Sequence, residues 1–176
     1  TTISCNGYTT NVSIYDSAYD ETIPRMYLDS SYDLITNKVT LKVYLSENSK
    51  LGAGDFVLSW DTDYFTYSSS VKKFSPSFFN INDKDVSQGE LKFSIISLSD
   101  IVDAYNVLEV TFDVENPRED ITVLFEISGS GLADSLTNSI NINFVNCTQA
   151  IPGNPSYNEY TITFDTGGGS LVGAIT

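Results

Sequence analysis

Lys38-Val39-Thr40-Leu41-Lys42-Val43-Tyr44-Leu45 alternates polar and apolar residues without a break. Successive side chains of a β-strand point to opposite faces, so a period of two predicts a strand with one buried face. The buried face would carry Val39, Leu41, Val43 and Leu45. This stretch decides the fold class, because the other strong patterns of the chain share its period.

The same alternation recurs in short segments that turn signals separate. Further strands are predicted over residues 56–60, 65–71, 91–95, 107–114, 121–127 and 140–145, with weaker ones over 11–15 and 26–28. The turn clusters fall at 49–54, 82–89, 115–120 and 128–134. No segment carries a sustained apolar stripe of helical period. Short strands at this spacing predict an all-β protein, an antiparallel β-sandwich.

Composition and charge exclude several functions. The 176 residues include 9 Lys and Arg, 23 Asp and Glu and no His, for a net charge of −14. Such a surface repels phosphate, which argues against nucleic-acid binding, and it would steer a basic partner at low salt. Without His, Ser-His-Asp and Cys-His catalysis cannot operate, and zinc loses its commonest ligand. A hydrophobic content of 41% is enough to bury a core in about one domain.

The two cysteines lie far apart, at Cys5 and Cys147. A zinc or redox motif would bring two cysteines close together in sequence, so we predict neither. A disulfide that clasps the ends of one domain is the first interpretation, and two free thiols are the alternative. The acidic, Tyr-, Ser-, Thr- and Asn-rich composition favours a secreted or cell-surface protein, and no apolar run approaches the 18 residues of a membrane span.

The chain divides into three parts by composition. We predict the sandwich over residues 1–148 and a linker over 149–159, which contains Pro152, Gly153 and Pro155. Residues 160–176 hold a strand pattern, Tyr160-Thr161-Ile162-Thr163-Phe164-Asp165, and then a glycine run. This segment is too short to bury a core of its own. It is therefore disordered, docked on the sandwich, or the start of a second module, and we favour the last.

Several strings resemble cohesin domains when they are taken in order. Leu51-Gly52-Ala53-Gly54-Asp55-Phe56-Val57-Leu58-Ser59-Trp60-Asp61 is similar to a glycine-rich turn that leads into an aromatic strand. Gly89-Glu90-Leu91-Lys92-Phe93-Ser94-Ile95 and Asn106-Val107-Leu108-Glu109-Val110-Thr111-Phe112-Asp113-Val114 resemble two later strands of that family. The resemblance covers residues 25–148. The segment from Tyr160 resembles the opening of the Listeria–Bacteroides (internalin B-type) repeat of bacterial surface proteins.

The cohesin resemblance implies a jelly-roll sandwich of about nine strands that docks a dockerin module through one sheet face. Calcium would belong to the dockerin, so we predict no cofactor and no metal in this chain. Asp55 matches an outward acidic residue that would accept hydrogen bonds from the dockerin. The alternation places Lys92, Ser94 and Ile96 outward beside it, and Ser97 stands where many members carry an acidic contact. Each of these residues could equally be an ordinary surface side chain.

Exposed aromatics offer a second interpretation, carbohydrate binding, and a structural spacer is a third. Flat aromatic side chains stack sugars in carbohydrate-binding modules, and five of them lie beside turn signals here: Tyr64, Tyr67, Phe78, Phe79 and Tyr105. Plugging of the sandwich ends by these rings is the alternative that we favour.

Neither calcium binding nor catalysis has a strong pattern. The Asp83-Lys84-Asp85 segment fails the EF-hand spacing, because Gly89 falls one residue late. Glu109, Asp113 and Glu115 alternate along one strand, but on its solvated face. We therefore predict a non-catalytic binding protein.

Overall fold

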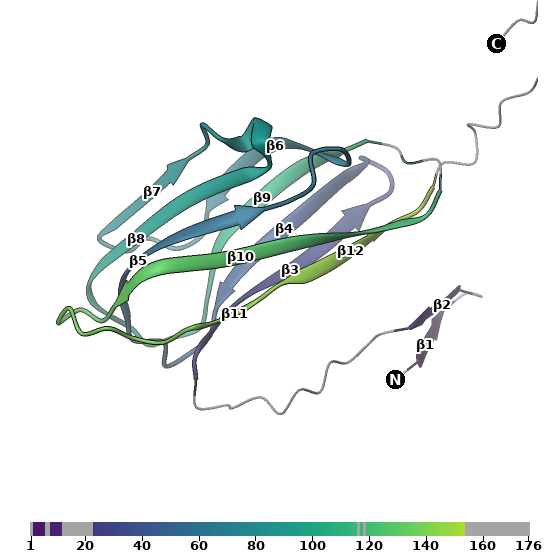
Figure 1. Cartoon of the computed structure of the whole chain (residues 1–176). Helices are drawn as coiled ribbons and strands as arrows, with labels where there is room; N and C mark the ends of the chain where they lie inside the picture. The colour runs from purple at the N-terminus through teal and green to yellow at the C-terminus, as the bar shows by residue number, and fades with distance from the viewer. Residues whose placement is uncertain (1, 6–7, 12–22, 116, 118, 154–176) are drawn as a thin grey trace, which may run out of the picture.

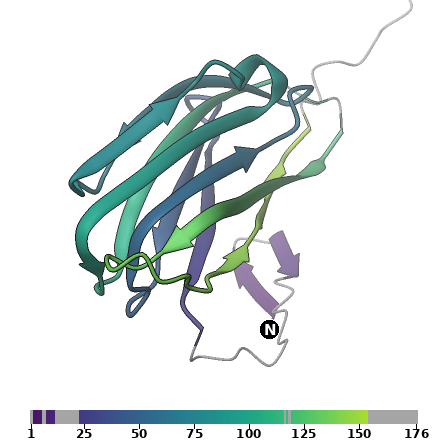
Figure 2. The ribbon, with the colours of Figure 1, turned by 60° about the vertical axis from the view of Figure 1, so that its left-hand side comes forward.

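The computed structural model describes residues 2–5, 8–11, 23–115, 117 and 119–153. Two five-stranded sheets pack face to face, and together they form a ten-stranded sandwich (Figure 1 and, turned by 60°, Figure 2). All neighbouring strands are antiparallel except β11 and β3, which are parallel. The predicted all-β sandwich is confirmed, and the described residues contain no α-helix.

The front sheet, as we name it, has the strand order β12-β10-β5-β8-β7. Its strands are β12 (Cys147–Ile151), β10 (Ile121–Ala133), β5 (Leu51–Ser59), β8 (Glu90–Ile101) and β7 (Phe78–Asn82). The back sheet has the order β11-β3-β4-β9-β6. Its strands are β11 (Asn143–Val145), β3 (Arg25–Asp33), β4 (Lys38–Leu45), β9 (Tyr105–Val114) and β6 (Phe65–Lys72). A 3-10 turn, η1 (Val86–Gln88), precedes β8, and a separate hairpin joins β1 (Thr2–Cys5) to β2 (Tyr8–Asn11).

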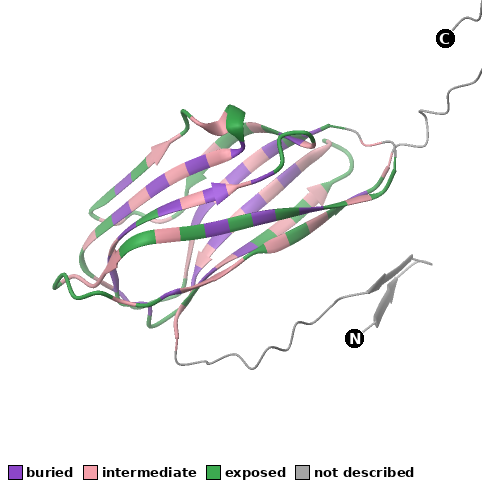
Figure 3. Cartoon of the chain, viewed as in Figure 1, coloured by how far each residue is buried: buried purple, intermediate pink, exposed green. Residues whose placement is uncertain are grey.

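The core lies between the sheets, where alternate residues of the central strands are buried (Figure 3). In β4 the buried residues are those that the alternation predicts. An aromatic cluster fills one end, with the Phe112 ring 4.9 Å from Trp60, 5.8 Å from Phe65 and 5.4 Å from Phe125 between centroids. Strands of both sheets supply these rings, so the cluster joins the two layers.

β5, β8 and β10 are longer than the sequence predicts, and in β5 and β10 the glycines mark close packing and not turns. β5 begins at Leu51, β8 continues to Ile101 and β10 continues to Ala133, so much of the turn clusters predicted at 49–54 and 128–134 is strand. A Cβ at Gly52 would lie 2.3 Å from the Ser135 backbone nitrogen, and one at Gly129 would lie 2.5 Å from the Phe144 ring. Only glycine fits at such approaches of backbone and ring.

The sandwich ends later than predicted, because the chain from β11 to β12 changes sheets. Residues 143–145 pair with β3 in the back sheet, and residues 147–151 pair with β10 in the front sheet. At the switch, the Asn146 Oδ1 atom accepts a hydrogen bond of 3.0 Å from the Ile127 N–H group. Ile151 is buried, so the sandwich passes the predicted boundary at 148 and the linker of 149–159 begins inside a strand.

Some predictions fall outside the described residues. They are residues 12–15 of the weak strand at 11–15, residues 154–159 of the linker, and the module start at 160–176. The strand predicted at 26–28 lies in the first half of β3. β7 is not among the predicted strands, because it has only five residues and opens with two adjacent phenylalanines, Phe78 exposed and Phe79 buried, instead of a polar and apolar alternation.

The predicted Cys5–Cys147 disulfide is not formed in this structure, since Cys147 is a free thiol. The side chain of Cys5 lies outside the described residues. Burial raises the pKa of the Cys147 thiol, a hydrogen bond with Ser30 acts against this, and the nearby Asp29 carboxylate raises the pKa further. The thiol is therefore held in its neutral form, which is a poor nucleophile.

We expect iodoacetamide to alkylate Cys147 slowly in the native chain at mildly alkaline pH and rapidly in urea, because unfolding removes the burial that keeps the thiol protonated. Mass spectrometry of the unreduced protein measures both rates. Equal rates would contradict a buried thiol, and a chain that stays unlabelled in urea would carry the disulfide instead.

No described helix is long and apolar enough to cross a membrane.

Candidate docking face

The outer face of the front sheet holds most of the predicted partner-binding residues. We define this outer face by the outward side chains of β7, β8 and β5, centred on Asp55, Ser94 and Ile96. The strand register places Asp55 opposite Ser94, and Ala53 opposite Ile96. Pairing of β7 with β8 then adds Phe78 beside Ile96. Three strands of one sheet carry this face, and two of them, β5 and β8, are interior strands held by neighbours on both edges.

An apolar end of the outer face is exposed. Ile96 is 47% exposed and Phe78 is 50% exposed, and they are cross-strand neighbours. Leu98, two residues further along β8, is 87% exposed. Aliphatic and aromatic surface in a contiguous group on a folded protein favours contact with another molecule.

The centre of the outer face is polar and ordered by its own hydrogen bonds. Ser94 Oγ donates a hydrogen bond of 2.6 Å to Asp55 Oδ1. Lys92 Nζ donates to Asp85 Oδ2 at 2.7 Å and forms an ion pair with Glu90 Oε2 at 3.2 Å. These carboxylates, Asp85 first, raise the pKa of Lys92. The face therefore presents fixed polar groups and not freely moving charges.

A depression of about 260 Å³ lies beside the Asp55–Ser94 pair. Its polar lining comes from β5, β7 and β8: Asp55, Asn80, Asn82, Lys92 and Ser94. The asparagines of β7 and Asp85, which holds Lys92, were not predicted as site residues. The alternation of β8 predicts the outward position of Lys92 and Ser94. It says nothing of Asn80 and Asn82, because β7 itself was not predicted.

Ser97 does not join the other predicted residues on the flat part of the outer face. The regular pairing of β5 with β8 ends at Ala53 and Ile96, and the register shifts before the next pair, Leu51 with Ile101. Ser97 lies in this irregular stretch and is partly buried. The simple alternation could not predict such a shift.

The five candidate carbohydrate-binding aromatics do not form an exposed platform. Phe79 is only 9% exposed and stacks on Phe93 at 5.8 Å, so this ring packs in the core, as the favoured alternative predicts, and is not available to a sugar. Tyr105 packs at 4.5 Å against Phe74, and the Tyr67 hydroxyl donates to Ser70. Three of the rings are partly buried against the core: Tyr64, Tyr67 and Tyr105. Phe78 alone of the five is well exposed, and a single ring offers no flat surface for a sugar chain.

The alternating carboxylates of β9 are paired with lysines. Lys73 lies 2.8 Å from Glu109 and lowers the pKa of that carboxyl, and Lys38 does the same to Asp113. A general acid of a glycosidase needs a raised pKa, whereas the pKa of each of these two carboxyls is lowered. Asp61 Oδ1 accepts a hydrogen bond from the Asp63 N–H group, so this carboxylate stabilises a local turn. Within the described residues, no three His, Cys, Asp or Glu side chains converge as metal ligands.

Comparison with known proteins gives structural relatives only. No protein-family model matches the sequence, and no curated protein matches it. Among solved structures, a non-cellulosomal cohesin from Archaeoglobus fulgidus is similar with a TM-score of 0.63 and 14% identity, over 76% of this chain and 94% of that one.

Two other similar structures are cohesins in complexes. The sixth cohesin of scaffoldin B from Acetivibrio cellulolyticus, bound to a Cel5 dockerin, has a TM-score of 0.56 and 21% identity over 72% of this chain and 96% of that one. The OlpA cohesin of Clostridium thermocellum, in its complex with Doc918, has a TM-score of 0.60 and 13% identity over the same shares. At these identities the likeness concerns the fold, and the described chain has the cohesin type of β-sandwich.

Proposed function

We propose that this chain is a non-catalytic recognition module that docks a protein partner of the dockerin type on the outer face of the front sheet. The observation that carries the proposal is the arrangement of exposed Ile96 and Phe78 next to the hydrogen-bonded Asp55–Ser94 pair. An apolar anchor beside fixed polar groups is the usual anatomy of a protein interface. The cohesins bound to dockerins among the similar structures support the same kind of partner.

The rigidity of the outer face suits this function. β5 and β8 are interior strands, and their inward side chains Phe56, Phe93 and Ile95 are buried in the core. Little side-chain or backbone entropy is then lost when a partner binds, so more of the contact energy appears as affinity. The net charge of −14 would speed association with a partner whose contact surface is basic.

We also propose that the module works outside the cell, at a bacterial surface. The acidic, hydroxyl-rich composition supports this location. Residues 154–176 would then link the sandwich to a second surface module, which the glycine run and strand pattern after Tyr160 suggest.

Asp55→Ala should lower the affinity for a dockerin-type partner about tenfold, because the partner's donors then lose a charged hydrogen-bond acceptor. The test uses calorimetry of the full chain with a calcium-loaded dockerin, chosen from a displayed library of dockerin modules. Asp29→Ala, which removes an exposed carboxylate from β3 of the back sheet, is the matched control and should leave the affinity unchanged. Equal losses in both variants, or binding that persists when EDTA removes the dockerin's calcium, would contradict the proposal.

A further inference from the structure

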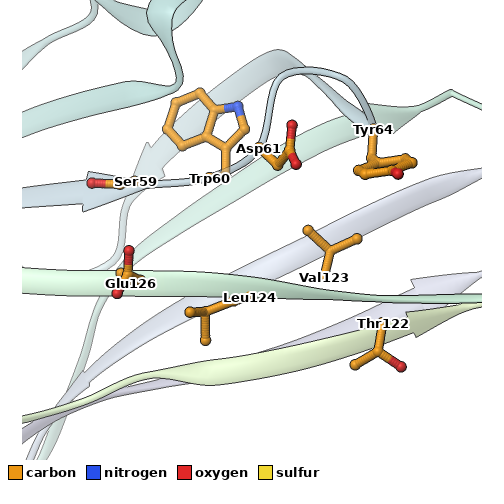
Figure 4. Close-up of a pocket in the computed structure, with 8 residues that line it drawn as sticks. All are labelled: Ser59, Trp60, Asp61, Tyr64, Thr122, Val123, Leu124 and Glu126. Carbon is orange, nitrogen blue, oxygen red and sulfur yellow. The ribbon is translucent and has the colours of Figure 1, made fainter.

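The front sheet contains a gap between β5 and β10. The two strands pair from Ser59 and Glu126 to Ala53 and Ala133. β10 begins earlier, and over residues 121–125 it pairs with β12 along one edge. Nothing in the described chain pairs with its other edge, because β5 ends at Ser59 and the chain crosses to β6. Figure 4 shows residues 60–64 on one side of the gap and β10 on the other.

Backbone groups of β10 point into this gap. The Ile127 N–H group bonds to Asn146, on the β12 side of the strand. Because backbone groups alternate between the two edges of a strand, residues 121, 123 and 125 also face β12. Thr122 and Leu124 therefore direct their N–H and C=O groups into the gap. Across it, the Trp60 N–H group is bonded to Gly89 O at 3.0 Å, so it faces away from β10.

The gap has the size and lining of a binding site for a peptide. Its volume is about 320 Å³. Apolar surface comes from Tyr64 and from Leu124, which is 46% exposed, and the charged lining groups are two carboxylates, Asp61 and Glu126. Residues 121–125 contain neither Lys nor Pro, the residues that usually protect a free strand edge from pairing.

We infer that the free edge of β10 binds an extended, basic segment of a partner protein, which joins the front sheet as an added strand. Its backbone would pair with Thr122 and Leu124, and its Lys or Arg side chains would lie next to Asp61 and Glu126. At about 3.3 Å per residue, some five residues fill the length of the open edge. Main-chain pairing supplies the affinity in such strand addition, and the flanking side chains supply selectivity. This site is separate from the outer face and does not depend on the function proposed for it.

The test is amide hydrogen exchange by NMR on the full chain, with the peptide acetyl-Thr-Lys-Val-Lys-Thr-Val-amide as the probe. In the free protein the amides of Thr122 and Leu124 should exchange quickly, whereas those of Val123 and Phe125 are protected by β12. Peptide at ten times its dissociation constant should slow exchange at Thr122 and Leu124 about tenfold. Native protection of these two amides in the free protein would overturn the inference, because the edge would then be closed.

Charge reversal separates the proposed contact from unspecific association. Glu126→Lys should abolish the slowing, and Glu47→Lys, at an exposed acid just after β4, should preserve it. The same peptide with Glu in place of Lys should not bind. Slowing that survives Glu126→Lys, that the acidic peptide also produces, or that is absent with the basic peptide would overturn the inference. Ile96→Asp should leave peptide binding intact, so failure here is distinguishable from failure of the outer face.

Discussion

Phe112→Ala should lower the free energy of unfolding by about 3–5 kcal/mol, the usual cost of removing a buried phenylalanine. Phe112 is fully buried, and its ring contacts rings from both sheets. The variant loses transfer free energy and leaves a cavity among aromatic neighbours that strands on both sides hold in place. Because domains of this size have a total stability of about 5–15 kcal/mol, the loss is a large share of it.

Urea denaturation followed by the fluorescence of Trp60, which contacts Phe112, measures this effect. The matched control is Phe78→Ala, which removes the same side chain from a position that is 50% exposed. We expect the control to lose less than about 1 kcal/mol. If the two variants were equally stable, Phe112 would not be a core residue, and the packing of the two sheets would be wrong.

Ile96→Asp should lower the affinity for a docked partner by about thirtyfold or more, which corresponds to the roughly 2 kcal/mol of an interface hot spot. Ile96 lies between Ala53 and Phe78 on the outer face and is 47% exposed. A carboxylate at this position would have to be desolvated when the partner binds, and it would add negative charge next to Asp55.

The control is Val71→Asp, which introduces the same charge at an aliphatic residue that is 53% exposed on β6 of the back sheet. It should bind the partner as the unmodified chain does. Circular dichroism and melting temperature of both variants check that each is folded. If the partner bound Ile96→Asp with unchanged affinity, the docking surface would not lie on the outer face of the front sheet.

The sequence predicted the central strands well, because one face of each is buried and the period of two is therefore strict. Residues 38–45 are an example, where the predicted strand and buried residues agree with β4. The ends of the sheets were harder. Glycines at 52 and 129 looked like turn signals, whereas each accommodates a close neighbour from a distant part of the chain. Such long-range contacts leave no local pattern.

The candidate site was predictable in part for the same reason. Alternation in β5 and β8 identified Asp55, Lys92, Ser94 and Ile96 as outward residues, and the register brings Asp55 and Ser94 within hydrogen-bond distance. The sequence offers Phe78 and Phe79 together as candidate exposed aromatics, with packing into the sandwich as the favoured alternative. In a strand two adjacent side chains take opposite faces, and here Phe79 enters the core. The gap beside β10 arises because β5 ends at Ser59 while β10 begins at Ile121, before its pairing with β5 starts. The sequence pattern of one strand does not show where a neighbouring strand ends.

Chemical-shift mapping of the labelled chain, with a calcium-loaded dockerin selected from a displayed library, tests the docking account most directly. We predict shifts that cluster on the outer face, at Asp55, Ser94 and Ile96. Shifts confined to the back sheet, around the stacked pair Tyr27 and Tyr44, would contradict the account, as would a library from which no dockerin binds.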